Sequence, residues 1–67
     1  MFRNLEAEQA RRQKSNSDVA ELLGISRASY ERKKKTGNFN RAQIVELMKI
    51  FDCDFNYLFD FFEEEVS

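Results

Sequence analysis

The sequence contains no histidine and no proline, and it has only two glycines and one cysteine. Without histidine the chain lacks the commonest general base and a principal zinc ligand. A single cysteine, Cys53, can form neither an internal disulfide nor a cysteine-based metal site. A strand-rich fold needs many turn residues, so the scarcity of proline and glycine favours helices interrupted at a few places.

Long apolar runs are also missing. No stretch approaches the ~20 apolar residues of a membrane span, and the N-terminus shows no signal-peptide pattern. We therefore expect a cytoplasmic protein with no membrane partner. The 67 residues form one expected domain, residues 1–67. Its core should be thin, because a domain of this size buries only about 60% of its unfolded surface.

Nothing in the sequence points to an enzyme or to a cofactor. There is no histidine, no glycine-rich loop that would cradle a phosphate, and no activated nucleophile. Cys53 stands between Asp52 and Asp54, and neighbouring negative charges raise the pKa of a thiol and make it less reactive.

The net charge of −1 hides a strong asymmetry along the chain. Residues 1–37 contain nine Lys or Arg and five Asp or Glu, which gives a net charge of +4. Residues 38–67 contain two Lys or Arg and seven Asp or Glu, which gives a net charge of −5. Such a dipole predicts a basic face for a polyanion and an acidic face turned away from it.

The spacing of apolar residues predicts an all-α fold of five helices, at about residues 2–12, 16–23, 27–34 and 41–51 and from 55 onward. Four residues are expected to be N-caps: Ser15, Ser26, Asn40 and Asp54. Gly24 suits a left-handed helix end, and residues 36–38 should form a loop with Phe39 packed under it. The acidic tail, residues 63–67, is expected to be frayed.

The predicted core combines one stripe from each helix with residues of the turn. It comprises Phe2, Leu5, Gln9, Val19, Ala20, Leu23, Ile25, Tyr30, Ile44, Leu47, Met48, Phe51, Phe55, Leu58, Phe59 and Phe62.

Two short helices joined by a three-residue turn form a helix-turn-helix unit at about residues 16–34. Ala20 must be small because the next helix crosses close to it. The outer side of that helix would present Arg27, Ala28, Glu31 and Arg32. A helix fits the major groove of DNA, where arginine can bond a guanine edge in bidentate fashion.

Three segments resemble phage repressors of the Cro/CI class, the XRE family: residues 4–8 (NLEAE), 15–30 (SNSDVAELLGISRASY) and 50–59 (IFDCDFNYLF). The resemblance covers about residues 2–60. It implies a lambda-repressor-like domain that controls transcription, commonly as a dimer on a palindromic operator. By motif position, Asn16 would contact phosphate, and Arg27, Ala28 and Arg32 would face bases.

The sequence departs from this family at several usually apolar positions. Lys33 and Lys34 occupy such positions late in the third helix. Gln9 and Lys14 occupy two more positions that are usually apolar in the family. These changes should thin the core and enlarge the basic face. They also leave open whether the third helix is ordered beyond Lys33.

The expected DNA-binding residues are Asn16, Ser26, Arg27, Ala28, Glu31, Arg32, Lys33, Lys35 and Asn38. Several have simpler alternatives. The run Arg32–Lys35 could also be ordinary solvated surface. Arg27 and Arg32 could contact phosphates and not bases. Asn16 could be only an early helix residue. For Glu31 an i,i+4 pair with Arg27 or Lys35 is favoured over base contact.

Three other basic residues and the acidic end of the chain are not expected to bind DNA or a metal ion. Arg3, Arg11 and Arg12 are interpreted as surface residues that aid solubility. Residues 52–63 imitate the ligand spacing of a calcium loop, but Tyr57 occupies the position that needs glycine, so we expect no calcium site.

Tyr57 and Phe61 lie four residues apart, on a helix face that the small core cannot cover. They predict a homodimer contact, with a partly exposed aromatic pair as the alternative. The alternative function for the whole chain is a protein-interaction module that keeps the helix-turn-helix fold, such as an antitoxin-like partner of another regulator. The acidic second half would suit that role.

Overall fold

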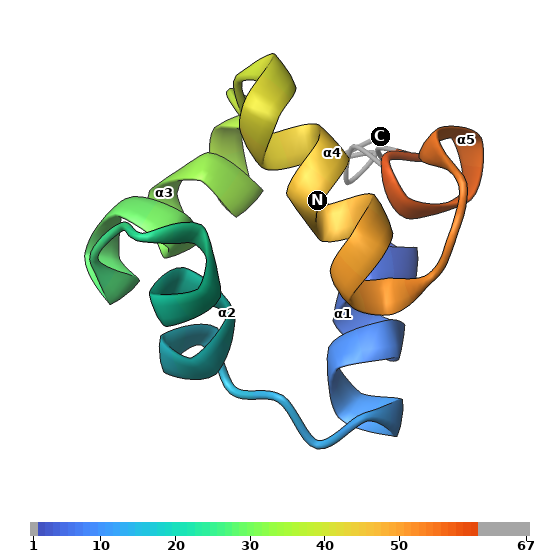
Figure 1. Cartoon of the computed structure of the whole chain (residues 1–67), viewed down its shortest axis with the longest axis horizontal. Coiled ribbons are helices and arrows are strands. Elements are labelled where there is room, and N and C mark those ends of the chain that lie inside the picture. Colours follow the sequence, from blue (N-terminus) through green and yellow to red (C-terminus); the bar gives the residue numbers. More distant parts are fainter. Residues whose placement is uncertain (1, 61–67) are drawn as a thin grey trace, which may run out of the picture.

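The computed structural model describes residues 2–60, and within them the chain forms five helices and no strand (Figure 1). The helices are α1 (Arg3–Arg11), α2 (Asn16–Leu23), α3 (Arg27–Thr36), α4 (Arg41–Phe51) and α5 (Phe55–Leu58). The predicted all-α fold is therefore confirmed. Phe61, Phe62 and the acidic tail 63–67 lie outside the described residues.

The third helix is longer than the sequence pattern predicted. It continues through Thr36 and ends at Gly37, whose φ of 77° is the left-handed conformation that glycine adopts at little steric cost. The Gly37 N–H donates to the Lys33 carbonyl at 2.8 Å. Helical order beyond Lys33, left open by the sequence, is therefore present.

All four predicted N-caps are confirmed. Ser15, Ser26, Asn40 and Asp54 each accept a hydrogen bond from the backbone N–H three residues later. At Ser15 the arrangement is reciprocal, because the Asp18 carboxylate accepts the Ser15 N–H at 2.9 Å. These short-range bonds satisfy N–H groups that a helix start leaves unpaired, and they explain why the helices begin where they do.

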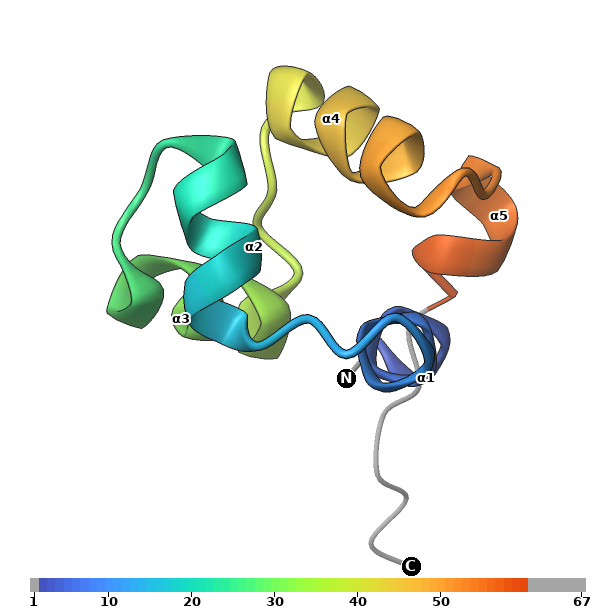
Figure 2. The ribbon, with the colours of Figure 1, turned by 60° about the horizontal axis from the view of Figure 1, so that its bottom comes forward.

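The helices enclose one core, with α2 and α3 together on one side and α1, α4 and α5 on the other (Figures 1 and 2). In Figure 2, α4 lies along the top and α1 is seen end-on at the bottom. The buried apolar side chains are Phe2, Leu5, Val19, Ala20, Tyr30, Phe39, Leu47, Phe51 and Leu58. None of the helices in residues 2–60 has the length and apolar character needed to cross a membrane.

The turn between α2 and α3 is built around Gly24 and Ala20. Gly24 has a φ of 73°, and the Ile25 N–H after it donates to the Ala20 carbonyl at 3.0 Å. This bond closes the end of α2 and turns the chain toward α3. Ala20 is buried, as its predicted position at the helix crossing requires.

A polar network fills the place where the sequence suggested a thinner core. The hydroxyl of buried Tyr30 donates to Gln9 Oε1 at 2.7 Å. The Gln9 Nε2 donates in turn to the Lys14 carbonyl and to Asn16 Oδ1, both at 3.1 Å. The side chain of Gln9 thus joins α1, the following loop, the start of α2 and the middle of α3.

Lys34 completes this network and points toward the domain. Its side chain is only 11% exposed, and its Nζ donates to Gln9 Oε1 at 3.0 Å and to Asn16 Oδ1 at 2.8 Å. It also forms an ion pair with Glu6 and lies 5.1 Å from the centre of the Tyr30 ring. Within the described residues no buried side-chain nitrogen or oxygen lacks a partner. Polar contacts therefore replace the apolar packing, and they satisfy one another.

A second polar cluster, which the sequence pattern did not reveal, surrounds Glu8. This carboxylate is 2% exposed and accepts the Tyr57 hydroxyl at 2.9 Å. Arg11 and Arg12 pair with it at 3.1 and 3.5 Å. Arg12 Nη2 also donates to the Phe51 carbonyl at the end of α4, at 2.7 Å. The interpretation of Arg12 as a surface residue for solubility was therefore incomplete, because Arg12 connects α1 to the C-terminal half, whereas Arg11 is exposed and pairs within α1.

Tyr57 belongs to the folded unit and is not left over from it. Its ring is half-buried against the core, its hydroxyl donates to Glu8, and its carbonyl accepts from Asn4 at 2.8 Å. The premise that Tyr57 lies on an uncovered face was therefore wrong. It overlooked that α1 packs against α5, which a spacing pattern within α5 cannot show.

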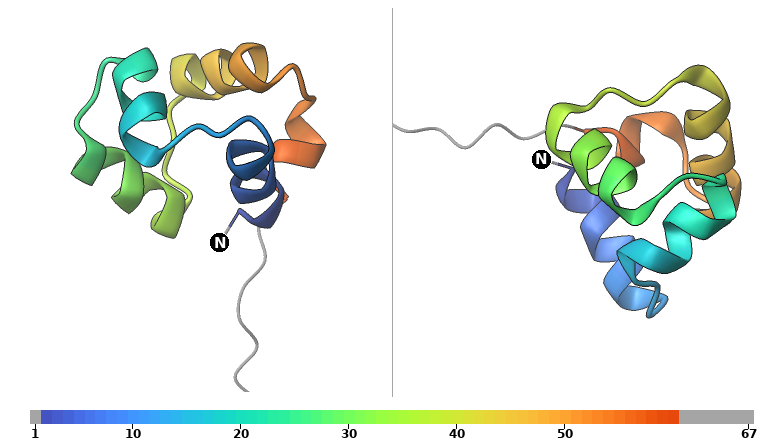
Figure 3. Two further views of the ribbon diagram at one scale, coloured as in Figure 1. Left: turned by 90° about the horizontal axis from the view of Figure 1, so that it is seen from below. Right: turned by 90° about the vertical axis from the view of Figure 1, so that its left-hand side faces the viewer.

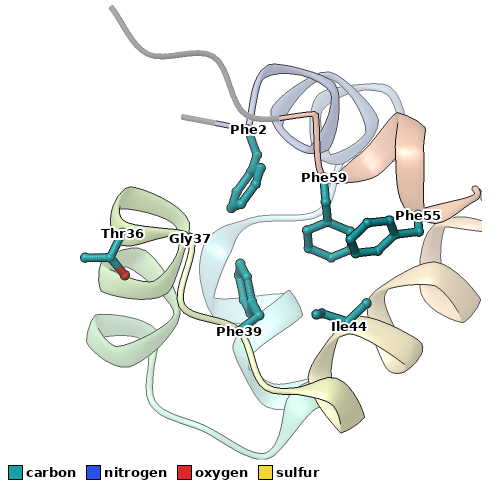
Figure 4. A pocket seen from close by; sticks show the side chains of 7 residues that line it. All are labelled: Phe2, Thr36, Gly37, Phe39, Ile44, Phe55 and Phe59. Carbon is teal, nitrogen blue, oxygen red and sulfur yellow. The ribbon is translucent and has the colours of Figure 1, made fainter.

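Phenylalanines close the core beside the end of α3. Phe2 lies edge-on to Phe59, with ring centres 5.4 Å apart, and Phe55 stacks on Phe59 at the same distance. With Phe39 they line an open apolar pocket of about 320 Å³ next to Gly37 (Figure 4). Phe55 was expected in the core but is 49% exposed, because it stands at the first turn of a four-residue helix, at the rim of the pocket.

The position of Lys34 generates a stability prediction. Lys34→Ala removes charge-assisted hydrogen bonds from a nearly buried group, so it should lower the free energy of unfolding by about 1–3 kcal/mol. Lys35→Ala, the matched control on the exposed side of α3, should change it by less than about 0.5 kcal/mol. Urea unfolding followed by circular dichroism measures both. Equal effects of the two substitutions would contradict the network described above.

Candidate nucleic-acid interface

The outer face of α3 is the exposed surface opposite Tyr30. Ala28, Arg32 and Lys35 follow one another at i, i+4 and i+7, and all three are exposed. Figure 3 (right) shows α3 in the foreground of the face that it shares with α2. The structure thus places Ala28 and Arg32 outward, as the sequence predicted.

The four consecutive cations of α3 do not act alike. Arg32 and Lys35 are exposed, whereas Lys33 is half-buried and its Nζ donates to the Asn38 carbonyl at 3.3 Å. Lys34 turns inward to Glu6, as described above. Within residues 2–60, Arg32, Lys33 and Lys35 have no acidic partner within ion-pair distance. The outer face of α3 therefore carries the uncompensated charges of Arg32 and Lys35, and half-buried Lys33 adds a third beside them.

Asn38 lies beside these charges in the loop after α3. Its side chain is exposed, its carbonyl accepts from Lys33, and its N–H donates to Thr36 Oγ1 at 3.3 Å. These bonds hold the loop against the end of the helix. Contact of Asn38 with DNA stays a prediction.

Arg27, Glu31 and Asn16 form a connected group at the start of α3. The Arg27 side chain is 68% exposed, and its Nε donates to Glu31 Oε2 at 2.8 Å. Asn16 Nδ2 donates to the same oxygen at 3.1 Å. The favoured pairing of Glu31 with Arg27 is confirmed. Arg27 is thus aligned with Glu31 one turn later and is rotated away from Arg32.

Both ends of the Asn16 amide are used within the protein. Its oxygen accepts from Gln9 and Lys34, and its nitrogen donates to Glu31. The Asn16 amide nitrogen has two N–H groups, of which Glu31 accepts one, and the predicted phosphate contact of Asn16 stays a prediction.

The charges in this group reinforce each other. The hydrogen bond from Arg27, followed by that from Asn16, lowers the pKa of Glu31. The same bond to Glu31 raises the pKa of Arg27. Both side chains are therefore ionised at neutral pH, and the pair as a whole contributes no net charge to the face.

The two helix starts on this side differ in their attraction for anions. Unpaired N–H groups and the helix dipole give each start partial positive charge. At α2 the Asp18 carboxylate occupies the first turn, and its pKa is lowered by hydrogen bonds from Ser15. The first turn of α3 contains no acid, and Ser26 caps it. Ser26 and the start of α3 therefore offer the better position for a phosphate.

The residues that resembled a calcium loop have structural roles where they are described. Asp54 Oδ1 accepts the Tyr57 N–H at 2.8 Å, which confirms its prediction as a cap, and Asp52 ends α4 with a φ of 51°. Among the described residues no group of three or more His, Cys, Asp or Glu side chains is arranged to hold a metal ion. Glu63 lies outside the described residues.

Cys53 has the raised pKa that the sequence predicted, for a partly different reason. Burial is the largest cause and the charge of Glu8 the second, while Asp52 contributes least. The thiol donates to the Phe51 carbonyl at 3.1 Å.

Comparisons with protein-family models, curated proteins and solved structures give no match for this chain. Its function must therefore be inferred from the geometry and charges described above.

The group at the start of α3 generates a pH prediction. The folded-state pKa of Glu31 lies below the ordinary value of 4.5, so its contribution to stability is present above that value and is lost as the pH falls through the folded pKa. Arg27→Ala should raise the pKa of Glu31, and Asn16→Ala should raise it less.

Carboxyl-carbon NMR titration of the folded protein measures these shifts. Asp18 is the internal control, because its pKa depends on Ser15 and should not respond to Arg27→Ala. An unchanged Glu31 titration in Arg27→Ala would show that the pair does not exist in solution.

Proposed function

We propose that this chain binds double-stranded DNA sequence-specifically, as a small transcriptional regulator of the Cro/CI-like XRE kind. In this proposal α3 lies in the major groove and α2 crosses the backbone beside it. The observation that carries the proposal is the division of charges on α3: exposed Arg32 and Lys35 and half-buried Lys33 lack acidic partners among the described residues, while Lys34 faces inward to Glu6.

The arrangement of the outer face matches the two kinds of contact that DNA requires. Arg32 follows Ala28 by one turn, and the small alanine allows the helix to come close to base edges. An arginine in that position can donate two hydrogen bonds to a guanine. Lys33 and Lys35 flank Arg32, where phosphates pass, and the capped start of α3 offers N–H groups to another phosphate.

The charge asymmetry supports one orientation on DNA. The +4 of residues 1–37 includes the α3 cations, whereas the −5 of residues 38–67 belongs to the half that follows α3. A phosphate backbone attracts the first half and repels the second. The overall charge of −1 argues against a non-specific nucleic-acid coat, so binding would be local.

Dimerisation on a palindromic operator is part of this proposal by family resemblance. Tyr57 is used inside the domain, and Phe61 lies outside the described residues. The large apolar side chains most exposed in residues 2–60 are Leu22, Val45 and Phe55. Sedimentation with and without operator DNA would measure the association.

These exposed apolar side chains also support the second candidate function, a protein-interaction module of the same fold. Salt separates the two candidates. Each phosphate contact releases a counterion, so DNA affinity falls steeply as salt rises, while an apolar protein interface changes little. A weak salt dependence of DNA binding would favour the interaction module.

The division of the α3 cations into two classes is testable by single substitutions. Arg32→Ala should cost about 1–3 kcal/mol on the preferred DNA site and relax the preference at one base position. Lys33→Ala and Lys35→Ala should weaken binding to all sequences alike and reduce the salt slope by about one unit each. Binding is measured by fluorescence anisotropy with site and scrambled duplexes.

Lys49→Ala on α4 is the matched control, because it removes one exposed positive charge far from α3 in sequence and should leave DNA binding almost unchanged. Alanine at Arg27, Arg32, Lys33 and Lys35 together should abolish binding while the helical spectrum is kept. Parent-like affinity of this quadruple variant would refute the assignment of α3.

A further inference from the structure

Within residues 2–60, Arg27 is the one exposed cation of α3 that is paired with a carboxylate, that of Glu31. Its guanidinium has five N–H groups, and the one at Nε is bound to Glu31 Oε2. Within the described residues the two Nη groups have no hydrogen-bond or ion-pair partner. A fork of two donors is therefore left at the exposed end of the side chain.

Glu31 is itself held in place from the other side. Asn16 Nδ2 donates to the same carboxylate oxygen at 3.1 Å, and Asn16 is anchored by Gln9 and by the nearly buried Lys34. A chain of hydrogen bonds thus runs from the core to the Arg27 guanidinium. Such support restricts the rotamers of a long side chain before it meets a ligand, which lowers the entropy lost on binding.

The carboxylate also decides which acceptor suits Arg27. A phosphate placed on the guanidinium would bring a second negative charge close to Glu31, and like charges at short distance repel. The O6 and N7 atoms of guanine are neutral acceptors with the spacing of the Nη fork. The surroundings of Arg27 therefore favour a guanine edge over the DNA backbone.

We infer that Glu31 is a positioning residue, which holds Arg27 through Nε and directs its Nη fork to a guanine of the bound DNA. Asn16 supports Glu31 in this role. The inference rests on the proposed DNA binding and adds to it which base Arg27 reads and how. Arg27 and Arg32 then read separate base positions, because they lie five residues apart in α3 and their side chains leave the helix in different directions.

The test measures base preference and overall affinity separately. Sites selected from random duplexes by the parent protein identify the guanine that Arg27→Ala no longer prefers. Glu31→Ala should reduce that preference by about fivefold to a hundredfold, the range that one bidentate arginine–guanine contact supplies. It should also raise the affinity for scrambled DNA, because a negative charge leaves the face.

Two further variants separate positioning from charge. Glu31→Gln removes the same charge but keeps an oxygen that can accept from Nε, so it should retain more of the guanine preference than Glu31→Ala. In the Arg27→Ala background, Glu31→Ala should cause no further loss of preference at that position. Glu46→Ala on α4 is the control for net charge, and thermal unfolding confirms that each variant is folded.

Each other outcome has a defined meaning. If the parent protein binds no DNA, the proposed function fails. If the parent selects a site but Glu31→Ala changes the affinity for all duplexes by one factor and keeps the preference, Glu31 only sets the charge of the face and the inference fails. A site at which Arg27→Ala alters no base preference would also overturn the inference while the proposed function stands.

Discussion

The hydrogen bond from the buried Tyr30 hydroxyl to Gln9 is the contact on which the rest of the structure depends. It joins the middle of α3 to α1, and both partners are buried. A buried polar group costs free energy unless it is paired, so each of these side chains requires the other. Burial also raises the pKa of Tyr30, which keeps its hydroxyl protonated as a donor. The position of α3 relative to the core follows from this pairing.

The network around Gln9 connects the core to the candidate interface through Asn16. The oxygen of Asn16 faces Gln9 and Lys34, while its nitrogen faces Glu31 on the exposed side. A small domain has little apolar core to hold a surface arginine, and hydrogen bonds supply directional support. The same residues that replace apolar packing therefore order the start of α3.

The Glu8 cluster plays a comparable role on the other side of α1. Its buried carboxylate pairs with the more exposed Arg11 and Arg12 and accepts the Tyr57 hydroxyl, and this hydrogen bond is the chief cause that raises the pKa of Tyr57. Arg12 also satisfies the Phe51 carbonyl at the end of α4. Gln9 and Glu8, adjacent in sequence, thus join α1 to opposite halves of the molecule.

What the sequence by itself determined is local. Three kinds of feature depend on residues within about one turn of each other, so spacing and side-chain chemistry predict them. They are the N-caps at Ser15, Ser26, Asn40 and Asp54, the end of α2 at Gly24, and the Arg27–Glu31 pair. The buried stripes of α1, α2 and α4 were predictable for the same reason. Only the tertiary structure decided that Lys34 points inward and pairs with Glu6, that Glu8 is buried, and that the Tyr57 hydroxyl binds Glu8 within the domain. These outcomes depend on partners 28 and 49 residues apart. A linear pattern cannot predict them, because burial and pairing are properties of helices that meet only in the folded chain.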